Sequence, residues 1–487
     1  MSISREINFK RIFKFIGILL MLLSGFMASS ALWEIVYDEG VTQPILISSL
    51  ITFGFGLFFY QLNPDKNQQN IGKKEGYIIV TFTWIFISIF GSLPFYLSGH
   101  IPSYTDAFFE TISGFTTTGA TILINIEDVP ASLLFWRSLT HWLGGMGIIV
   151  LTLAILPVLG VGGMQLFVAE APGTTPARLH PRITETAKRL WLIYLILTLM
   201  CCFLLMLGGM NFFDAINHSF STLATGGFST RNDSIMGFSP YIQYVIIFFM
   251  VLAGTNFTLH YFALKGQFTK LRDNEEFRFY LLIMLVFSVL FTASIIYFHQ
   301  SGIEQAFRDS LFQVVSIVTT TGFISVDYLN WNGFLWFTLF LLMFTGGCIG
   351  STAGGMKMIR HLLLIKNLGQ EFKRLIHPNA VLPTRLEGKT IPTEIIYNFL
   401  AFFLLYIMLF MTGAAIMSLI GLDFITSLGV VAATLGNVGP AIGSAGPLDN
   451  YAHIPSAGKW FLSFFMLLGR LELFTVLLLL TPVFWKK

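Results

Sequence analysis

Long apolar segments alternate with short polar ones along almost the whole chain. Two apolar runs come first, at about 16–32 and 45–60, and eight more follow in four pairs. The pairs are 75–98 with 131–158, 184–208 with 238–264, 279–298 with 333–356, and 393–420 with 457–482. Most of these runs reach the roughly 20 apolar residues that cross a hydrocarbon layer about 30 Å thick. The pattern therefore predicts ten membrane-spanning helices.

The first apolar run has two interpretations. It follows a basic segment, residues 1–15, and it contains Ala28-Ser29-Ser30-Ala31, a possible signal-peptidase site. The run is long enough to span the membrane, however, and the second apolar run follows at once. We favour a two-helix hairpin within residues 1–70, and a cleaved signal is the alternative.

A short motif containing glycine, and in most copies threonine, lies between the two members of each later pair. The four copies are Thr116–Ala120, Ala224–Phe228, Thr319–Phe323 and the more divergent Gly436–Pro440. An aspartate precedes the glycine of the motif by 13 residues in the first three copies and by 16 residues in the fourth. These aspartates are Asp106, Asp214, Asp309 and Asp423. Four such motifs about 100 residues apart form an internal repeat.

The repeat predicts the fold class. We expect an all-α polytopic membrane protein with four pseudo-symmetric helix–pore loop–helix units around one pore, preceded by the two-helix hairpin. The units cover residues 71–165, 166–270, 271–375 and 376–487, and the third carries a glycine-rich gating loop.

Composition and charge support this picture. The 487 residues are 54% hydrophobic and 11% charged, and the mean hydropathy is +0.73, which excludes a soluble domain. Cytoplasmic segments of membrane proteins are enriched in Lys and Arg. With both termini in the cytoplasm, all but five of the 29 Lys and Arg fall in cytoplasmic segments. The five are Arg137, Arg231, Arg308, Lys459 and Arg470. The four loops then face the outside.

The loop chemistry points to a cation pathway. In the third copy we expect Asp309 to cap a helix over 310–317, which spans only about 12 Å and must re-enter rather than cross. Its C-terminal end carries partial negative charge, and backbone carbonyls after it can replace the hydration shell of an ion. The predicted filter residues are Thr117, Thr118, Gly119, Thr225, Gly226, Gly227, Thr320, Thr321, Gly322, Asn437, Val438 and Gly439. Ordinary turns between helices are the alternative.

The four loops resemble the selectivity filters of the superfamily of K+ transporters that includes the Trk, Ktr and HKT proteins. The characteristic filter glycines of that family match Gly119, Gly227, Gly322 and Gly439. The hairpin and the chain length resemble the bacterial Trk branch more than the shorter Ktr subunit. The Asn437-Val438 pair, in place of two threonines, departs from the other loops, but a divergent fourth quarter is typical of the family.

The resemblance implies a function and partners. It implies the conducting subunit of a K+ uptake system in the cell inner membrane, with K+ as the transported ion and no catalytic activity. It also implies a homodimer that binds cytoplasmic, TrkA-like regulatory subunits. Those subunits would bind the nucleotide, because this chain has neither a Walker loop nor a dinucleotide fingerprint. We expect membrane lipid as a further partner, and no nucleic acid.

A glycine-rich segment interrupts the run 333–356. Glycine is a poor helix former, by about 1 kcal/mol relative to alanine, so we expect a loop at mid-membrane depth that obstructs the pore. The predicted gate residues are Gly346, Gly347, Gly350, Ser351, Thr352, Gly354, Gly355 and Arg470. Arg470 lies deep in the last apolar run, where a charge is costly and usually functional, and the loop carbonyls are its expected partners. A helix-packing seam and a structural ion pair of Arg470 are the alternatives.

Other polar residues are open to more than one interpretation. Asn256 is as suited to helix packing as to the pore, and His141 and His218 fit structural roles better than sensing. Cys201, Cys202 and Cys348 have neither metal-binding nor disulfide spacing. The basic segment 357–391 fits membrane topology and anionic lipid, or a docking surface for the regulatory subunits.

Two other functions are alternatives to K+ uptake. One is a cation channel that also passes Na+, and the other is a cation-coupled secondary symporter. Symporters usually contain two related halves with acidic residues at the midplane, whereas this chain contains four units. An enzyme is the least favoured class, because no nucleophile–base arrangement is visible.

Overall fold

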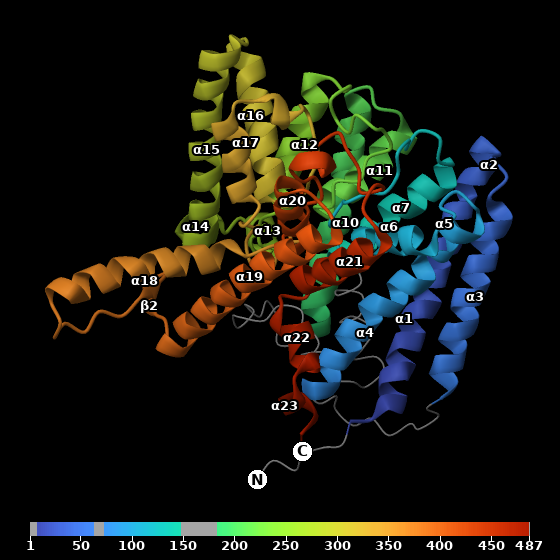
Figure 1. Ribbon diagram of the computed structural model, residues 1–487, viewed down its shortest axis with the longest axis horizontal. Helices are drawn as coiled ribbons and strands as arrows, with labels where there is room; N and C mark the ends of the chain where they lie inside the picture. The colour runs from blue at the N-terminus through green and yellow to red at the C-terminus, as the bar shows by residue number, and fades with distance from the viewer. Residues whose placement is uncertain (1–6, 63–72, 148–182, 487) are drawn as a thin grey trace.

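The computed structural model describes residues 7–62, 73–147 and 183–486, which are mostly helical (Figure 1). Within these described ranges, six helices are long and apolar enough to cross a membrane as single elements. They are α1 (Phe9–Ser30, continued by η1, Ala31–Trp33, and α2, Glu34–Tyr37), α3 (Thr42–Gln61), α4 (Lys73–Gly91, with α5, Leu93–Leu97), α10 (Ile183–Leu207), α15 (Glu275–His299) and α19 (Thr393–Ile420). These helices confirm six of the ten predicted spans.

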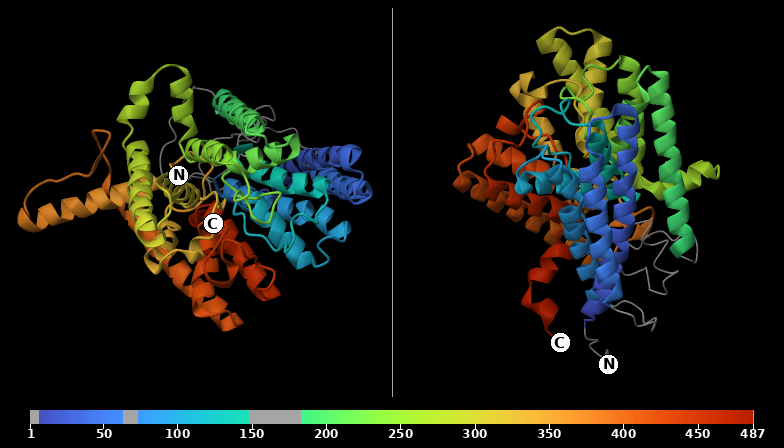
Figure 2. Two further views of the ribbon diagram at one scale, coloured as in Figure 1. Left: turned by 90° about the horizontal axis from the view of Figure 1, so that it is seen from above. Right: turned by 90° about the vertical axis from the view of Figure 1, so that its right-hand side faces the viewer.

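The helices α1 and α3 lie side by side along their length (Figure 2). Gly17 and Gly56 face each other at their closest approach, and a Cβ on either would lie within 3.0 Å of the other's carbonyl oxygen. Small residues permit such an approach in membrane helices. The hydroxyl of Ser49 also donates to the Ser24 carbonyl at 2.8 Å. The two N-terminal helices therefore form a tightly packed antiparallel pair.

The second helix of each later pair is broken wherever the structure describes it completely, as the sequence predicted for the run 333–356 but not for the other two runs. The predicted helix 238–264 is two helices, bent by 102° at Gly254–Asn256. The runs 333–356 and 457–482 are also broken, between residues 342 and 358 and between residues 470 and 474. The elements concerned are α12 (Pro240–Ala253), α13 (Phe257–Leu264), α17 (Gly333–Leu342), α18 (Met358–Ile376), α21 (Ser456–Arg470), α22 (Phe474–Leu480) and α23 (Pro482–Trp485). The predicted helix 131–158 begins as α7 (Ala131–Trp142) and a π-helical turn (Leu143–Gly147), and its remainder lies outside the described residues.

Four short helices lie between the paired long ones. They are α6 (Tyr104–Phe115), α11 (Phe212–Leu223), α16 (Ile303–Val318) and α20 (Phe424–Leu435). Each packs against the long helix before it and the broken helix after it. Three of them also pack against the broken helix of another pair: α6 against α21, α11 against α7, and α16 against α12. Three of the short helices thus connect one pair to the next.

The capping prediction for Asp309 is wrong. Helix α16 starts at Ile303 after Gly302, so Asp309 lies inside the helix. The 16 residues of α16 span about 24 Å, twice the expected length. Asp423 does cap its helix and accepts the Thr426 N–H at 3.0 Å. Hydrogen bonds from Thr426 lower the pKa of Asp423, so they favour the charged form of the capping carboxylate.

Helix α18 extends away from the rest of the molecule (Figures 1 and 2). Its first turns are buried, whereas Leu368, Phe372 and Leu375 in its distal half are exposed. A small antiparallel hairpin, β1 (Arg385–Leu386) and β2 (Lys389–Thr390), follows it and leads into α19. The start of α1 and the end of α23 lie at one end of the molecule. The shorter remaining elements are α14 (Phe268–Asp273), η3 (Tyr328–Asn330) and η4 (Gly443–Ala445).

Candidate functional site

The four short helices end in the same backbone motif. In each, the second residue past the cap donates its N–H to the carbonyl five residues earlier, which is a Schellman ending. The bonds are Thr118–Ser113 at 2.9 Å and Gly226–Ser221, Thr321–Ser316 and Val438–Ala433 at 2.8 Å. The residue before each donor has left-handed φ: Thr117 51°, Thr225 53°, Thr320 57° and Asn437 52°. The divergent fourth loop therefore has the same conformation as the other three.

The predicted filter glycines follow these endings and also have positive φ, between 78° and 95°. All four line one pocket. A Cβ on each glycine would lie within 3.0 Å of a carbonyl oxygen in the next loop. The contacts are Gly119 to Gly226, Gly227 to Thr321, Gly322 to Val438, and Gly439 to Thr118. These contacts run once around and return to the first loop, so the structure brings all twelve predicted filter residues together in one closed ring of backbone.

The surroundings of the ring favour a cation. The C-terminal ends of α6, α11, α16 and α20 all lead directly into the ring, and helix C-termini carry partial negative charge. The side chains of the threonines and Asn437 in the ring are fully buried. The Asn437 amide donates to the Thr118 hydroxyl and to the Met466 carbonyl, both at 2.9 Å, which ties the fourth loop to the first.

The glycine-rich loop between α17 and α18 lies directly against the ring. The Gly354 N–H donates to the Thr320 hydroxyl at 2.8 Å, and the hydroxyls of Thr352 and Thr225 are 3.4 Å apart. A Cβ on Gly354 would contact Asn437. The loop therefore touches the left-handed residue of the second, third and fourth ring loops.

The same loop also fills the break between α12 and α13. The Cys348 N–H donates to the Gly254 carbonyl at 2.8 Å, and the Phe257 N–H donates to the Gly350 carbonyl at 3.0 Å. Each backbone break thus supplies hydrogen-bond partners for the other, which satisfies polar groups that a bilayer cannot. Asn256 caps α13 by accepting the Thr258 N–H at 2.8 Å, in keeping with the packing interpretation.

Arg470 lies where the sequence indicated, against the loop carbonyls. Its Nη1 donates to the Thr352 carbonyl at 2.7 Å, and its Nη2 donates to the carbonyls of Gly144 and Gly145 at 2.6 and 2.8 Å. The neighbouring Glu472 forms a buried ion pair with Arg360 of α18. Arg470 therefore connects the glycine-rich loop to the turn after α7.

The sequence did not indicate one residue that holds the glycine-rich loop in place. Glu276, near the start of α15, is buried and accepts the N–H groups of Ile349 at 2.8 Å and Ile359 at 3.1 Å. The Nζ of Lys357 also donates to the Ala353 carbonyl. The available signal was an acidic residue at the start of an apolar run, which is unremarkable alone. The predicted histidines are buried behind the second loop, where His141 stacks on Phe228.

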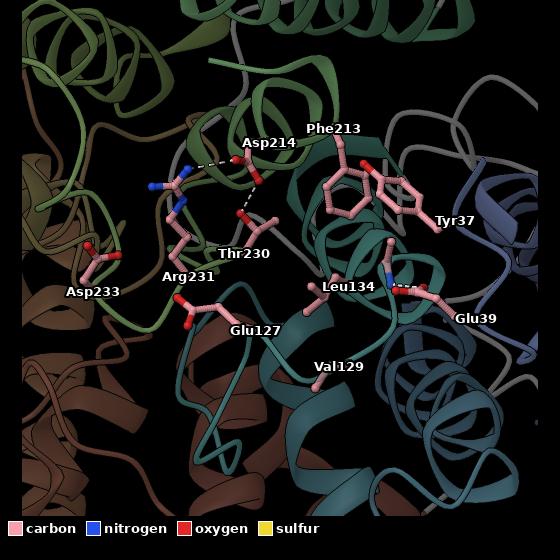
Figure 3. A pocket seen from close by; sticks show the side chains of 11 residues that line it. Tyr37, Glu39, Glu127, Val129, Leu134, Phe213, Asp214, Thr230, Arg231 and Asp233 are labelled. Atoms are coloured by element: carbon pink, nitrogen blue, oxygen red, sulfur yellow. Dashed lines mark hydrogen bonds and ion pairs between the residues drawn. The ribbon is translucent and has the colours of Figure 1, made fainter. Parts of the chain in front are cut away.

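A second, more acidic pocket lies beside the ring pocket, and Arg231 lines both. Its lining includes Glu39, Glu127, Asp214 and Asp233 (Figure 3). Asp214 is held by Arg231 at 3.3 Å and by the Thr230 hydroxyl at 2.6 Å. Among the described residues no three His, Cys, Asp or Glu side chains are placed to hold a metal ion together. This pocket adds negative charge near the ring.

Comparison with known proteins gave one consistent result. The family model of TrkH, described as cation transport protein, matches residues 43–487. The Trk system potassium uptake protein TrkH of Halomonas elongata is 41% identical over 484 residues, covering 99% of this chain and 100% of that protein. TrkG of Escherichia coli K12 is 33% identical and covers 96% of this chain and 97% of its own length. The crystal structure of the potassium transporter TrkH from Vibrio parahaemolyticus has a TM-score of 0.89 at 39% identity, covering 98% of this chain and 100% of that one.

Proposed function

Because this chain belongs to the TrkH family of cation transport proteins, we propose that it is the conducting subunit of a K+ uptake system. Its family is one of transporters and not of enzymes, and its apolar helices make it a multi-pass membrane protein. Relatives of nearly equal length are named as Trk system potassium uptake proteins. That name supports K+ as the cargo of this chain.

The observation that carries the proposal is the closed ring of four loops. In each loop the residue before the filter glycine turns its carbonyl toward a neighbouring loop. A ring of carbonyl oxygens can replace the water around K+, and the four helix C-termini behind it add favourable charge. The ring is the selectivity filter, and the four units are quarters of one pore. The divergent pair Asn437 and Val438 supplies the fourth quarter through its backbone.

The glycine-rich loop is the gate in this proposal. It touches three quarters of the ring, and glycine gives its backbone alternatives of similar energy. Arg470 holds it through the Thr352 carbonyl at 2.7 Å and places a positive charge near the ion path. Closed and open states would differ in whether the loop stays against the ring.

Orientation and partners complete the proposal. The end carrying the start of α1 and the end of α23 faces the cytoplasm, and the ring pocket opens outward from the inner membrane. The chain forms a homodimer and binds TrkA-like regulatory subunits through α18 and its hairpin. Lys366, Lys373 and Arg385 line a shallow pocket there, which suits acidic partner residues or lipid phosphates.

Planar bilayers test the proposed function when one side has mostly K+ with a little Na+, and the other side has the reverse mixture at the same total salt. Purified protein should give unitary currents that reverse near the K+ equilibrium potential, and protein-free bilayers give the background. A reversal potential near zero in symmetric total salt would favour a channel that also passes Na+. Saturable tracer uptake without unitary currents would favour a symporter. Either result would contradict the proposal.

A further inference from the structure

One position behind the ring recurs in all four loops. Counting nine residues back from each filter glycine gives Glu110, His218, Gln313 and Val430. All four are buried, and each lies on a short helix. The first three reach across to the segment that returns from the ring. His218 Nε2 lies 2.9 Å from the Ser229 hydroxyl, and Gln313 Nε2 donates to the Ser325 hydroxyl at 3.3 Å. We refer to this position as the brace.

The first brace is the most strongly bonded. Glu110 accepts the Thr121 hydroxyl and the Ile122 N–H, both at 2.8 Å. Thr121 and Ile122 directly follow the filter loop of the first quarter. The descending helix and the returning segment are therefore fastened to each other through one carboxylate, immediately behind Gly119.

A buried arginine extends this brace to the second quarter. Arg137 of α7 forms an ion pair with Glu110 at 2.6 Å, and their side chains are only 2% and 0% exposed. Its Nη1 donates to the Ser229 carbonyl at 2.9 Å, and its guanidinium lies 3.5 Å from the ring centroid of Phe228. Phe228 and Ser229 directly follow the filter glycine of the second loop. One ion pair thus touches the outgoing segments of two neighbouring quarters.

Thermodynamic stability alone is a weak reason for such a pair. Desolvation of two charges offsets most of their attraction, and apolar replacements of similar volume often stabilise a protein equally well. Directional bonds from a planar guanidinium, however, fix the distance between the groups that it joins. A filter needs such fixed spacing, because its selectivity depends on where the coordinating oxygens are held.

We propose that Glu110 and Arg137 are positioning residues that set the spacing of the first and second filter loops, and with it the preference for K+ over Na+. This inference rests on the proposed function. The four brace residues also differ in how firmly each holds its quarter of the ring. The ion pair fixes the first quarter most firmly, His218 and Gln313 fix the next two through single hydroxyl partners, and Val430 offers only packing.

The decisive variant is the double change Glu110→Gln with Arg137→Gln, because it removes both charges and leaves neither buried alone. The ratio of Na+ to K+ permeability, from reversal potentials of unitary currents, should rise by about threefold to tenfold, the factor for one lost net hydrogen bond. Arg137→Lys, which keeps the charge but loses the fork, should give an intermediate ratio. The ratio is measured on open channels, so it is independent of how much protein folds.

Glu304→Gln is the matched control. Glu304 also pairs with an arginine on a short helix, Arg308 at 3.2 Å, but it is exposed and far from the ring in sequence. Its permeability ratio should equal that of the wild type. A wild-type ratio in both the double variant and Arg137→Lys would overturn the inference while leaving the proposed function intact. A wild-type protein that does not distinguish K+ from Na+ would overturn the proposed function itself.

Discussion

At the scale of single residues, the ring depends on threonine in a conformation that threonine avoids. Left-handed φ costs an ordinary residue about 1–2 kcal/mol, and a branched Cβ makes it rarer still. Strain of this kind gathers at functional sites where surrounding contacts hold it. Thr320 has such contacts, because its hydroxyl accepts the Gly354 N–H of the glycine-rich loop. Thr117 has a similar φ, and among the described residues its buried hydroxyl has no hydrogen-bond partner.

This contrast gives the first prediction. Thr320→Gly should raise K+ flux per folded molecule severalfold, about the factor expected for one lost hydrogen bond of roughly 1 kcal/mol, because the gate loop loses an acceptor. Thr117→Gly relieves the same backbone strain without touching the gate and serves as the control. Radioactive Rb+ uptake, normalised to monodisperse protein, measures both. Equal effects in the two variants would show that the hydroxyl does not hold the gate.

The second prediction concerns the filter glycine of the first loop. In Gly119→Ser the new Cβ would lie within 3.0 Å of the Gly226 carbonyl oxygen, at a φ of +80°. The carbonyl must shift, so the ratio of Na+ to K+ permeability should rise about tenfold or more, the change for about 1.4 kcal/mol of lost discrimination. Gly99→Ser is the control, because Gly99 has a φ of +76° and open space around its Cα. A K+ preference retained in Gly119→Ser would count against this glycine as a filter residue.

At the scale of elements, the sequence predicted what length and composition determine. Apolar runs of sufficient length gave the six straight spans, and the glycine content of residues 346–355 marked one break. The break after Arg470 had no such mark, because Leu471 and Leu473 are good helix formers. There Glu472 and Leu473 adopt positive φ while Arg470 and Glu472 reach partners on other elements. Tertiary contacts override local preference at that break, and a single sequence does not display them.

The third prediction follows from these contacts of Arg470. Arg470→Ala should raise normalised Rb+ flux, because it frees the Thr352 carbonyl and removes a positive charge near the path. Deleting part of Gly346–Gly355 should do the same. Combining both changes should give less than the product of the single effects, since both act on one element. Flux that stays level in Arg470→Ala would show that Arg470 does not hold the loop closed, and would favour a structural role for this arginine.

The fourth prediction concerns the joint between α18 and the break that separates α21 from α22. Arg360 and Glu472 are about 5% and 4% exposed, so Glu472→Gln removes the carboxylate facing a buried guanidinium. It should lower stability by about 3–5 kcal/mol, whereas replacing both residues by apolar ones should restore most of it. Thermal unfolding in detergent measures both variants. Lys366→Gln is the control, because its pair with Glu275 is far more exposed. A negligible loss in Glu472→Gln would show that the joint is held by packing alone.

At the scale of the whole molecule, four quarters of one chain already complete the ring. Further copies therefore add rings rather than close one, and two-fold pairing is the commonest arrangement of identical chains. The fifth prediction is a dimer with two independent ion paths. Light scattering of the purified protein in several mild detergents should give twice the chain mass of 54.6 kDa. A monomer in all of them would contradict the dimer.

Because a single chain closes the ring, mutations act on it differently than they would in an assembly of identical subunits. In an assembly of identical subunits, every mutation of the filter appears at all positions at once, and small adjustments are impossible. Here a codon change alters one quarter and leaves three as they were. The four brace residues, an acid, an imidazole, an amide and a valine, already differ from one quarter to the next. Ion preference in this architecture can drift by small steps, each tested by selection while the other quarters keep the protein working.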